Sequence, residues 1–448
     1  MTEHKTCDSF YHSCLDNNWL SILLNGKIMM NISYCLQTVL FLALCIAGCG
    51  GGDAGGNPPV NNSNPPVAGW QRQSENPLIV PILTNTIQDH GPADPSILFD
   101  NEDNKWKAWF SSTLEDRASS VKTITIRYAE SADGVHWSNP QTVFQTASDS
   151  NAWDYTSVET PAVIKNPNPV TPEKKFMMWY SGANTTLAAS ENRPSGPGAL
   201  TYYQIGLAYS PDGKIFTRHL PGLNYKPGLV LVASASLFGA SLPGTFGDGT
   251  TSDPEVIFKD GMFHMWLSSY AESVPNPVTP NGRLPLAFGI AHMTSSDGVN
   301  WSTNHANPLA SLFKPSDAAG GRDPSVLFNQ NTNQYEMWFT NDTLADELSI
   351  PCHFNTVIGF WHAVSNDGIQ WTPDYAKYDL RYDTQYRYEA LGFLRGIDVV
   401  MVSGHYQAYY SAFGTERIPD SSIYLCPDQQ NNPIPAVLSL NRATYISP

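Results

Sequence analysis

Four carboxylate residues stand at comparable places in the chain, each close before an apolar run. They are Asp94, Glu159, Asp253 and Asp323. If one narrow opening collected all four, mutual repulsion and loss of hydration would raise some of their pKa values. A protonated carboxyl group could then act as an acid beside an ionised carboxylate that acts as a base. The alternative is structural, because an aspartate before proline also caps a turn at the start of a strand.

A short sequence motif that occurs four times predicts the strands and turns that would position these residues. Each copy reads Ser-x-Asp-Gly-x-x-aromatic, and the copies are 131–137, 210–216, 295–301 and 365–371. Asp-Gly is a tight-turn signal, because glycine accepts the positive φ that a hairpin turn needs. A turn that recurs every 70 to 85 residues indicates one supersecondary unit repeated along the chain. We assign the aspartates of these turns to structure.

The repeated unit has a constant order of predicted strands. The carboxylate opens an apolar strand, an aromatic strand follows, a third strand leads into the Asp-Gly turn, and a fourth comes after it. This order predicts a four-stranded antiparallel blade. Five units of roughly 75 residues fit between Trp70 and Pro448, within the range of propeller folds. We therefore expect an all-β, five-bladed β-propeller; a β-solenoid is the rival fold, although its repeats are usually much shorter.

The N-terminal end of this region indicates how the ring would close. Trp70 is followed by Asn76-Pro77-Leu78 at the same spacing at which Trp301 is followed by Asn307-Pro308-Leu309. The segment after Trp70 thus looks like an outer strand without a unit of its own. We expect it to complete the last blade and so to close the ring.

The amino-acid composition and net charge limit the classes of binding partner that the protein is expected to have. The chain has 448 residues, of which 12% are aromatic and 15% charged, with 34 prolines and 33 glycines. This suits one large, turn-rich all-β domain. The formal net charge of −16 leaves no basic stripe to neutralise phosphates, so nucleic acid is not an expected partner.

The N-terminal region is expected to be a targeting segment. Residues 39–49 form an apolar run, too short to span a bilayer comfortably, that ends in Ile-Ala-Gly-Cys and closely resembles a bacterial lipobox. We expect 1–48 to be a signal peptide whose true start is Met29 or Met30, and 49–69 to be a lipidated Cys49 and a flexible linker. The propeller would occupy 70–448. The glycine after Cys49 favours a lipid anchor in the outer membrane of a bacterial cell envelope.

Two of the seven cysteines fall within the expected mature domain, Cys352 and Cys426. In an oxidising compartment they could form a disulfide, and two separate buried thiols are an equal alternative. No cysteine and histidine pattern with zinc spacing is present, so no metal site is expected from motifs. A structural Ca²⁺ held by channel carboxylates is compatible with the sequence but not specified by it.

The sequence motifs also resemble those of a known enzyme family, and this resemblance makes the expected function more specific. The order of Asp-Pro before a strand, an aromatic strand ending in Trp-Tyr-Ser or Trp-Phe-Ser, and Ser-x-Asp-Gly-x-x-Trp resembles the five-bladed glycosidases of glycoside hydrolase families 43, 32 and relatives. It covers about 70–411. The resemblance implies cleavage of glycosidic bonds in an oligo- or polysaccharide, with a base or nucleophile Asp on blade one, a supporting Asp on blade two and an acid Glu on blade three.

This sequence departs from that pattern, since residue types are exchanged between blades. Asp94 matches the first position, but Glu159 stands where the supporting Asp belongs, and Asp253 stands where the acid belongs. We expect Asp94 to be the base or nucleophile and Glu159 the acid, with Asp253 and Asp323 tuning charge or holding the sugar. A second set, Asp253, Asp323 and Glu389, has the family order. However, alignment of the last unit puts Gly396 at the carboxylate position.

Four other residues are candidates for substrate binding at the same opening. They are His90, Trp153, Asp154 and Arg322. An indole such as that of Trp153 can stack on a sugar ring, and His90 could orient Asp94, although a core tryptophan and a solvated histidine are the structural alternatives. The non-enzymatic alternative for the whole protein is a glycan-binding or scaffolding propeller whose carboxylates are structural.

Overall fold

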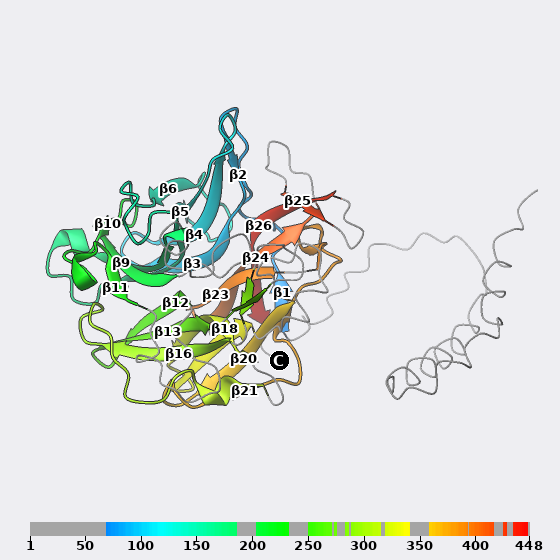
Figure 1. Ribbon diagram of the computed structural model, residues 1–448. Helices are drawn as coiled ribbons and strands as arrows, with labels where there is room; N and C mark the ends of the chain where they lie inside the picture. The colour runs from blue at the N-terminus through cyan, green and yellow to red at the C-terminus, as the bar shows by residue number, and fades with distance from the viewer. Residues whose placement is uncertain are drawn as a thin grey trace, which may run out of the picture. The chain divides into compact units, whose positions relative to one another are not determined.

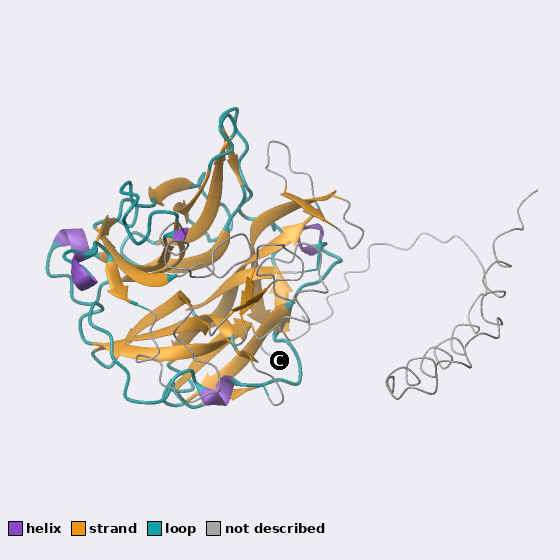
Figure 2. Cartoon of the chain, viewed as in Figure 1, coloured by secondary structure: helices purple, strands orange, loops and turns teal. Residues whose placement is uncertain are grey.

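The computed structural model describes an all-β unit, and the helical elements bounded within its described residues are short 3₁₀ turns (Figures 1 and 2). The described residues are 69–185, 203–232, 250–270, 273–275, 283–285, 288–314, 319–340, 358–392, 394–415, 424–427 and 433–446. The expected signal peptide, Cys49, most of the linker and Cys352 lie outside these ranges. Within them, no helix is long and apolar enough to cross a membrane.

Five strands are each the first strand of an antiparallel set. They are β3 (Ala93–Asp100), β7 (Ser157–Lys165), β12 (Thr250–Lys259), β18 (Arg322–Asn329) and β23 (Leu394–Val402). Their antiparallel partners are β4 (Lys105–Asp116), β8 (Phe176–Ala183), β13 (Met262–Tyr270), β19 (Gln334–Thr340) and β24 (His405–Gly414). The predicted aromatic strands fall within these partners.

Each set has a third strand, which pairs antiparallel with the second strand. These strands are β5 (Lys122–Ser131), β9 (Gln204–Ser210), β16 (Phe288–Ser295), β20 (Gly359–Ser365) and β26 (Pro433–Ile446). Outer strands in four sets are β6 (Gln141–Phe144), β10 (Thr217–Arg218), β21 (Trp371–Pro373) and β1 (Gly69–Arg72). The first strands contact one another in the order β3, β7, β12, β18, β23 and back to β3. Sheets whose first strands gather in this way have the architecture of a β-propeller.

The four copies of the turn phrase have two backbone hydrogen bonds in common, from the glycine N–H to the serine Oγ and from the next N–H to the aspartate Oδ1. In the first copy, Oγ of Ser131 accepts the N–H of Gly134 at 2.9 Å, and Oδ1 of Asp133 accepts the N–H of Val135 at 2.9 Å and of His136 at 2.8 Å. Gly134 has φ +73°, which only glycine adopts at little cost. The carboxylate thus caps backbone donors of its own turn, as expected for a structural residue.

Each of these turns is also hydrogen-bonded to an aromatic side chain from the second strand of the preceding set. The bonds are Trp109 Nε1 to Gly213 O (2.7 Å), Trp179 Nε1 to Gly298 O (2.9 Å), Trp266 Nε1 to Gly368 O (2.9 Å) and Tyr409 OH to Gly134 O (3.1 Å). The three tryptophans and Tyr409 are fully buried. The spacing of the turn and the aromatic residue within the repeat therefore allows a hydrogen bond between one set and the next, which stabilises both.

The N-terminal strand pairs with the last set, as expected. Strand β1 runs antiparallel to β26, with Trp70 opposite Tyr445. The indole N–H groups of Trp70 and Trp338 both donate to Oδ2 of Asp379 at 2.8 Å. This shared carboxylate connects β1 to the set that begins with β18.

The two Asn-Pro segments that looked alike in sequence make the same contacts. Asn76 Oδ1 accepts the N–H of Arg442 and its Nδ2 donates to the carbonyl of Arg442, both at 2.9 Å. Asn307 brackets the backbone of His292 in the same manner, also at 2.9 Å. The segment after Trp70 is thus the structural equivalent of the segment after Trp301.

Three histidines form a hydrogen-bonded row in the third set. Nε2 of His292 lies 3.2 Å from Nδ1 of His264, and its Nδ1 lies 2.9 Å from Nε2 of His305. Burial, together with the neighbouring His264 and His305, lowers the pKa of His292 to about 3, against a smaller opposing effect of Asp367. The folded protein therefore holds His292 neutral under conditions in which an unfolded chain would protonate it.

We expect this histidine to make the protein acid-sensitive. The contribution of neutral His292 to the free energy of unfolding is complete above the unfolded pKa of about 6.5 and is lost as the pH falls from there towards 3. At pH 5 the loss should be about 2 kcal/mol. Urea unfolding at pH 7 and pH 5 measures this loss, which should be smaller in His292→Asn. His136→Asn is the matched control, because the equivalent turn carries Asn300. Equal acid losses in the wild type and His292→Asn would contradict this account.

Candidate active site

The five first strands break their pairing register at the same point, near the start of each strand. One residue there is left-handed in every strand: Asp94 (φ +50°), Thr160 (+48°), Asp253 (+52°), Asp323 (+52°) and Gly396 (+62°). Aspartate and glycine tolerate this region, whereas a β-branched threonine is strained in it. Gly396 lies where the sequence alignment placed it.

This geometry corrects the sequence alignment of the second unit. Glu159 is not the equivalent of Asp94, because Thr160 has the left-handed conformation and Glu159 precedes it by one residue. Its structural equivalents are the residues before the other left-handed positions, among them Arg322 and Arg395. The carboxylate of Glu159 therefore enters the site from a different backbone position than the three aspartates do.

Serines from the second strand of the preceding set hold three of these left-handed residues. Ser111 Oγ accepts the N–H of Thr160 at 2.7 Å, Ser181 Oγ that of Asp253 at 3.0 Å, and Ser268 Oγ that of Asp323 at 2.9 Å. Because all three serines are buried, the left-handed residues are fixed relative to the neighbouring sheet. The side chains at this point are thus positioned by two sets at once.

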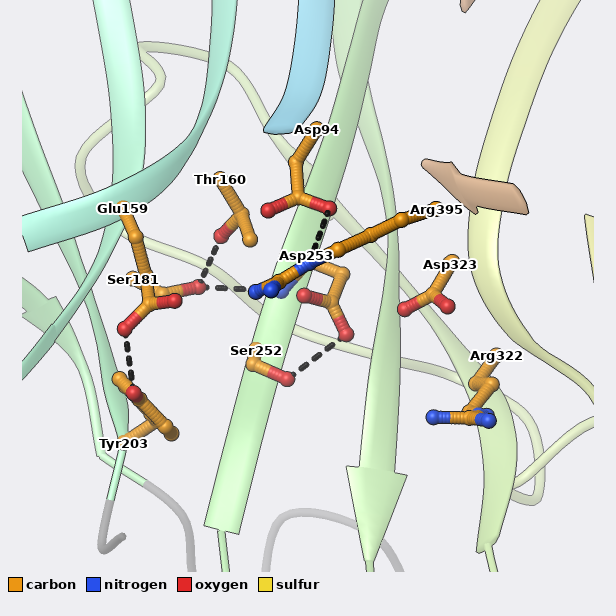
Figure 3. A pocket seen from close by; sticks show the side chains of 10 residues that line it. All are labelled: Asp94, Glu159, Thr160, Ser181, Tyr203, Ser252, Asp253, Arg322, Asp323 and Arg395. Atoms are coloured by element: carbon orange, nitrogen blue, oxygen red, sulfur yellow. Dashed lines mark hydrogen bonds and ion pairs between the residues drawn. The ribbon is translucent and has the colours of Figure 1, made fainter. Parts of the chain in front are cut away.

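All four predicted carboxylates line one pocket, with about 470 Å³ of empty space including its open mouth (Figure 3). The pocket is lined by Asp94, Glu159, Thr160, Ser181, Tyr203, Ser252, Asp253, Arg322, Asp323 and Arg395. All of its lining side chains carry polar groups. The structure therefore brings together residues more than 200 positions apart in sequence.

Asp94 faces Arg395, which belongs to another first strand, β23. Its Oδ1 lies 3.7 Å from Nε of Arg395, and its Oδ2 is buried without a hydrogen-bond partner in the described part of the chain. Burial raises the pKa of Asp94 to about 6, with Arg395 opposing the rise and the Asp253 and Glu159 carboxylates adding to it. Such a carboxyl group changes its charge in the mildly acidic range.

Asp323 and Asp253 form a coupled pair from adjacent first strands, β18 and β12. Burial raises the pKa of Asp323 well above its usual range, and the charge of Asp253 raises it further, against a lowering by Arg322. Ser252 Oγ donates to Oδ2 of Asp253 at 2.8 Å. Two neighbouring carboxyl groups repel each other when both are ionised, which favours the protonated form of Asp323.

Glu159 is oriented by two hydroxyl groups that converge on the same oxygen. Ser157 Oγ donates to its Oε1 at 2.5 Å, and Tyr203 OH donates to that oxygen as well (Figure 3). Tyr203 stands just before strand β9, so two strands of one set determine where this carboxylate points.

Of the four predicted substrate-binding residues, only Arg322 lines the pocket. Trp153 is 3% exposed, stacks on Tyr180 with ring centroids 5.7 Å apart, and donates its indole N–H to Pro227 O. It is therefore a core residue, because no face is open to a sugar. The prediction of a stacking platform at Trp153 is wrong.

Asp154 and His90 also point elsewhere. Asp154 is 1% exposed and accepts hydrogen bonds from Tyr180 OH at 2.9 Å and from Arg218 Nε at 2.7 Å, so it serves an internal ion pair. His90 is buried with its Nε2 2.8 Å from Glu115 Oε2 and is not among the residues of the pocket. His90 and Asp154 were expected at the pocket because they lie close in sequence to Asp94 and Glu159, and this expectation is wrong.

Five pocket residues were not predicted as site residues: Thr160, Ser181, Ser252, Arg395 and Tyr203. The last two bring a charged or phenolic group to the pocket. Arg395 directly precedes Gly396, so the alignment that placed Gly396 could have indicated it. Tyr203 comes before its strand in a stretch without a recognisable motif, and no sequence signal marked it. Both residues reach the pocket because first and third strands of different sets converge there.

Below the pocket, a second ring of polar side chains ties the first strands together. Ser96 Oγ accepts the N–H of Val163 at 3.0 Å, and Asp398 Oδ2 accepts the N–H of Ile97 at 2.5 Å. Ser325 Oγ accepts the N–H of Val399 at 2.9 Å, and Glu255 Oε1 that of Val326 at 3.4 Å. The carboxylates of Asp398 and Glu255 therefore have a structural role, as acceptors of backbone N–H groups from neighbouring first strands.

The alternative acid Glu389 lies away from the pocket. It is fully buried in the 3₁₀ turn η4 (Arg387–Glu389) and pairs with Arg72 of β1. The set Asp253, Asp323 and Glu389 is therefore not a catalytic constellation.

The described residues contain no group of three or more histidines, cysteines, aspartates or glutamates arranged to hold a metal ion. The geometry thus gives the Ca²⁺ considered from the sequence no support. Cys426 lies in β25 (Tyr424–Pro427), while Cys352 is outside the described residues, so their predicted disulfide stays a prediction.

The fold is similar to that of known carbohydrate-active enzymes. The structure of a BT0996–RGII complex has a TM-score of 0.54 at 14% identity, over 84% of this protein and 92% of that one. A glycoside hydrolase has a TM-score of 0.51 at 14% identity, over 82% and 90%. The β-1,2-mannobiose phosphorylase of Listeria innocua has 0.50 at 12% identity, over 84% and 97%.

Sequence comparison adds nothing to this likeness, since no protein-family profile and no curated protein sequence matches the chain. The resemblance to propeller glycosidases seen in the sequence motifs is thus confirmed at the level of the fold. The activity has to be argued from the site.

Proposed function

We propose that this protein is a glycoside hydrolase with a five-bladed β-propeller closed by β1. The circular order of contacts among the first strands and the pairing of β1 with β26 support the blade count and the closure. One observation carries the activity: four carboxyl groups converge on one pocket, and burial has raised the pKa values of two of them. Glycoside cleavage needs such a difference in protonation between neighbouring carboxyl groups.

Asp94 serves as the base or nucleophile. Its unpartnered Oδ2 is buried at the pocket, and above pH 6 the group is mostly ionised. A buried carboxylate without hydrogen bonds to that oxygen is the more reactive towards a water molecule or a sugar carbon.

The proton donor is Asp323, with Asp253 beside it. The sequence suggested Glu159 for this role, but the raised pKa of Asp323 favours its protonated form and so supports Asp323 as the donor. Glu159 then binds sugar hydroxyl groups with its carboxylate, held by Ser157 and Tyr203.

The pH dependence of kcat/KM follows from these roles. Activity should fall as the pH drops through about 6, where Asp94 becomes protonated, and should fall again on the alkaline side when Asp323 loses its proton. Because the charge of Arg395 lowers the pKa of Asp94, Arg395→Gln should move the acid limb to higher pH. An acid limb near pH 4 in the wild type would contradict the assignment of Asp94.

A panel of oligosaccharides tests the function itself. The full-length protein is incubated with neutral and acidic glycans, and the release of new reducing ends is followed. Release that disappears in Asp94→Asn supports a glycosidase. Binding of a glycan without release, by a folded protein, would instead indicate the non-catalytic glycan-binding propeller.

We further propose that the protein is a lipoprotein of the bacterial envelope, anchored through Cys49 and facing its glycans there. This proposal depends on the sequence alone. Membrane fractionation tests it, since Cys49→Ala should move the protein into the soluble fraction.

A further inference from the structure

Thr160 occupies a position that aspartate or glycine occupies in the other four first strands. The left-handed residue is Asp94 in β3, Asp253 in β12, Asp323 in β18 and Gly396 in β23, but Thr160 in β7. Strand β7 contacts both β3 and β12, so Thr160 stands between Asp94 and Asp253 in the circular order of the strands. At this position the pocket therefore carries a neutral hydroxyl group in place of a carboxyl group (Figure 3).

The backbone of Thr160 is strained, with φ +48°, and two contacts hold it in this conformation. A β-branched side chain disfavours a left-handed backbone, and a strained residue persists only where the surrounding structure fixes it. The N–H of Thr160 donates to Ser111 Oγ at 2.7 Å, and its Oγ1 lies 2.5 Å from Ser181 Oγ. Thr160 and both serines are buried. The hydroxyl group of Thr160 therefore has a fixed place at the pocket.

Ser181 connects this hydroxyl group to the backbone of Asp253 in the next set. Ser181 Oγ accepts the N–H of Asp253 at 3.0 Å and is also hydrogen-bonded to Thr160 (Figure 3). A serine hydroxyl group has one proton and two acceptor lone pairs, so it can form both bonds at once. A fully bonded network of this kind makes a buried site rigid. The position of the Asp253 backbone thus depends on Thr160 through one side chain.

The position of Asp253 matters because its carboxyl group acts on that of Asp323. Burial raises the pKa of Asp323, and the charge of Asp253 and a hydrogen bond with Asp253 raise that pKa further. Arg322 on the same strand lowers it, and Asp94 on β3 gives a smaller rise. The other charged groups that line this pocket are Glu159 and Arg395. A movement of Asp253 away from Asp323 should therefore lower the pKa of Asp323.

We propose that Thr160 is a positioning residue of the active site, whose hydroxyl group fixes Asp253 next to Asp323 through Ser181. This inference rests on the proposed glycosidase function, in which Asp323 donates the proton. An aspartate in place of Thr160 would tolerate the backbone conformation and could also bond to Ser181, but its charge would stand next to those of Asp94 and Asp253. Threonine makes the connection without adding a charge, which gives a reason for a strained residue at this position.

Thr160→Val and Thr160→Ser test this role in the full-length protein. Valine keeps the branched shape without the hydroxyl group, so kcat/KM should fall by about 10- to 100-fold, as expected when a catalytic group is displaced. The alkaline limb of the pH profile should also move to lower pH, because Asp323 would lose its proton more easily. Serine keeps the hydroxyl group and should retain most of the activity and the wild-type alkaline limb.

Thr125→Val is the matched control. The hydroxyl group of Thr125 is also buried and donates to Ser112 O at 3.5 Å, but Thr125 is not among the pocket residues. This variant should change neither kcat/KM nor the pH profile. A wild-type alkaline limb in Thr160→Val would overturn the proposal, even if the activity were lower. Equal losses in Thr160→Val and Thr160→Ser would also overturn it, because the hydroxyl group would then have no role.

A measurement without substrate separates this proposal from the glycosidase proposal. In protein with ¹³C-labelled aspartate, NMR follows the titration of the Asp323 carboxyl group, and Asp323→Asn identifies its signal. The midpoint should be lower in Thr160→Val than in the wild type and Thr160→Ser, and an unchanged midpoint would contradict the positioning role. If Thr160→Val folds poorly, Ser181→Ala breaks the same connection and should also lower the midpoint. Failure of the glycosidase proposal would instead be seen as absence of new reducing ends from every glycan.

Discussion

Asp94→Asn is expected to lower kcat by about 10²- to 10⁴-fold while the affinity for the sugar changes little. Asparagine has the shape of aspartate and tolerates the left-handed φ of +50° at this position, so the pocket should keep its form. What is lost is the ionisable oxygen, because an amide can neither accept a proton from water nor attack a sugar carbon. Steady-state kinetics on the best glycan of the panel provides the measurement.

Asp212→Asn is the matched control for this prediction. Asp212 accepts the N–H of Lys214 at 2.9 Å in its turn and is not among the pocket residues. Its variant should retain wild-type kcat. If Asp94→Asn retained more than about a tenth of the wild-type kcat, Asp94 would have no acid–base role.

Asp323→Asn separates the two candidate proton donors. If Asp323 is the donor, this variant should lose the alkaline limb of the pH profile together with most of the activity, whereas Glu159→Gln should mainly raise KM. The opposite pattern would restore Glu159 to the role that the sequence suggested.

Glu389→Gln is expected to lower the free energy of unfolding by about 3–5 kcal/mol, the cost of leaving a buried charge without its partner. Glu389 is fully buried and accepts hydrogen bonds from Arg72 at 3.2 Å, from Tyr410 OH at 2.5 Å and from the Asp383 N–H at 2.6 Å. Arg72 belongs to β1, so loss of this ion pair should release the strand that pairs with β26. Urea unfolding at pH 7 measures the change.

Two further variants control this experiment. Glu75→Gln removes an exposed carboxylate close to the same strand and should change stability by less than 0.5 kcal/mol, as surface substitutions commonly do (about ±0.5 kcal/mol). Arg72→Gln combined with Glu389→Gln should cost less than the sum of the single changes, because the double variant has no unpaired charge. A loss below about 1 kcal/mol in Glu389→Gln would mean that β1 is held by its other contacts.

The general architecture could be predicted because it depends on local chemistry that repeats. A glycine with positive φ and a carboxylate that caps its own turn need only adjacent residues, and the turn at 131–137 has those contacts. The structural likeness of the segments after Trp70 and Trp301 could also be predicted from their sequences. In the structure, Asn76 and Asn307 form the same hydrogen bonds with the backbone. Repetition converted these local signals into an order of strands.

The site was predictable only in part. The four carboxylates do line one pocket, but Glu159 enters it one residue away from the expected position. A strand places alternate side chains on opposite faces, so a register break of one residue changes which side chain points where. Nothing in Glu159-Thr160-Pro161 indicates which residue takes the left-handed conformation.

Residue types and their spacing along the chain were therefore sufficient for the propeller, its turns and the gathering of carboxylates at one end of the first strands. Only the tertiary structure decided that Trp153 and Asp154 are buried, that Arg395 and Tyr203 reach the pocket, and that the pKa values of Asp94 and Asp323 are raised. Burial and the distance between charges depend on residues far apart in the chain, and they set the pKa of a carboxyl group more strongly than its sequence neighbours do.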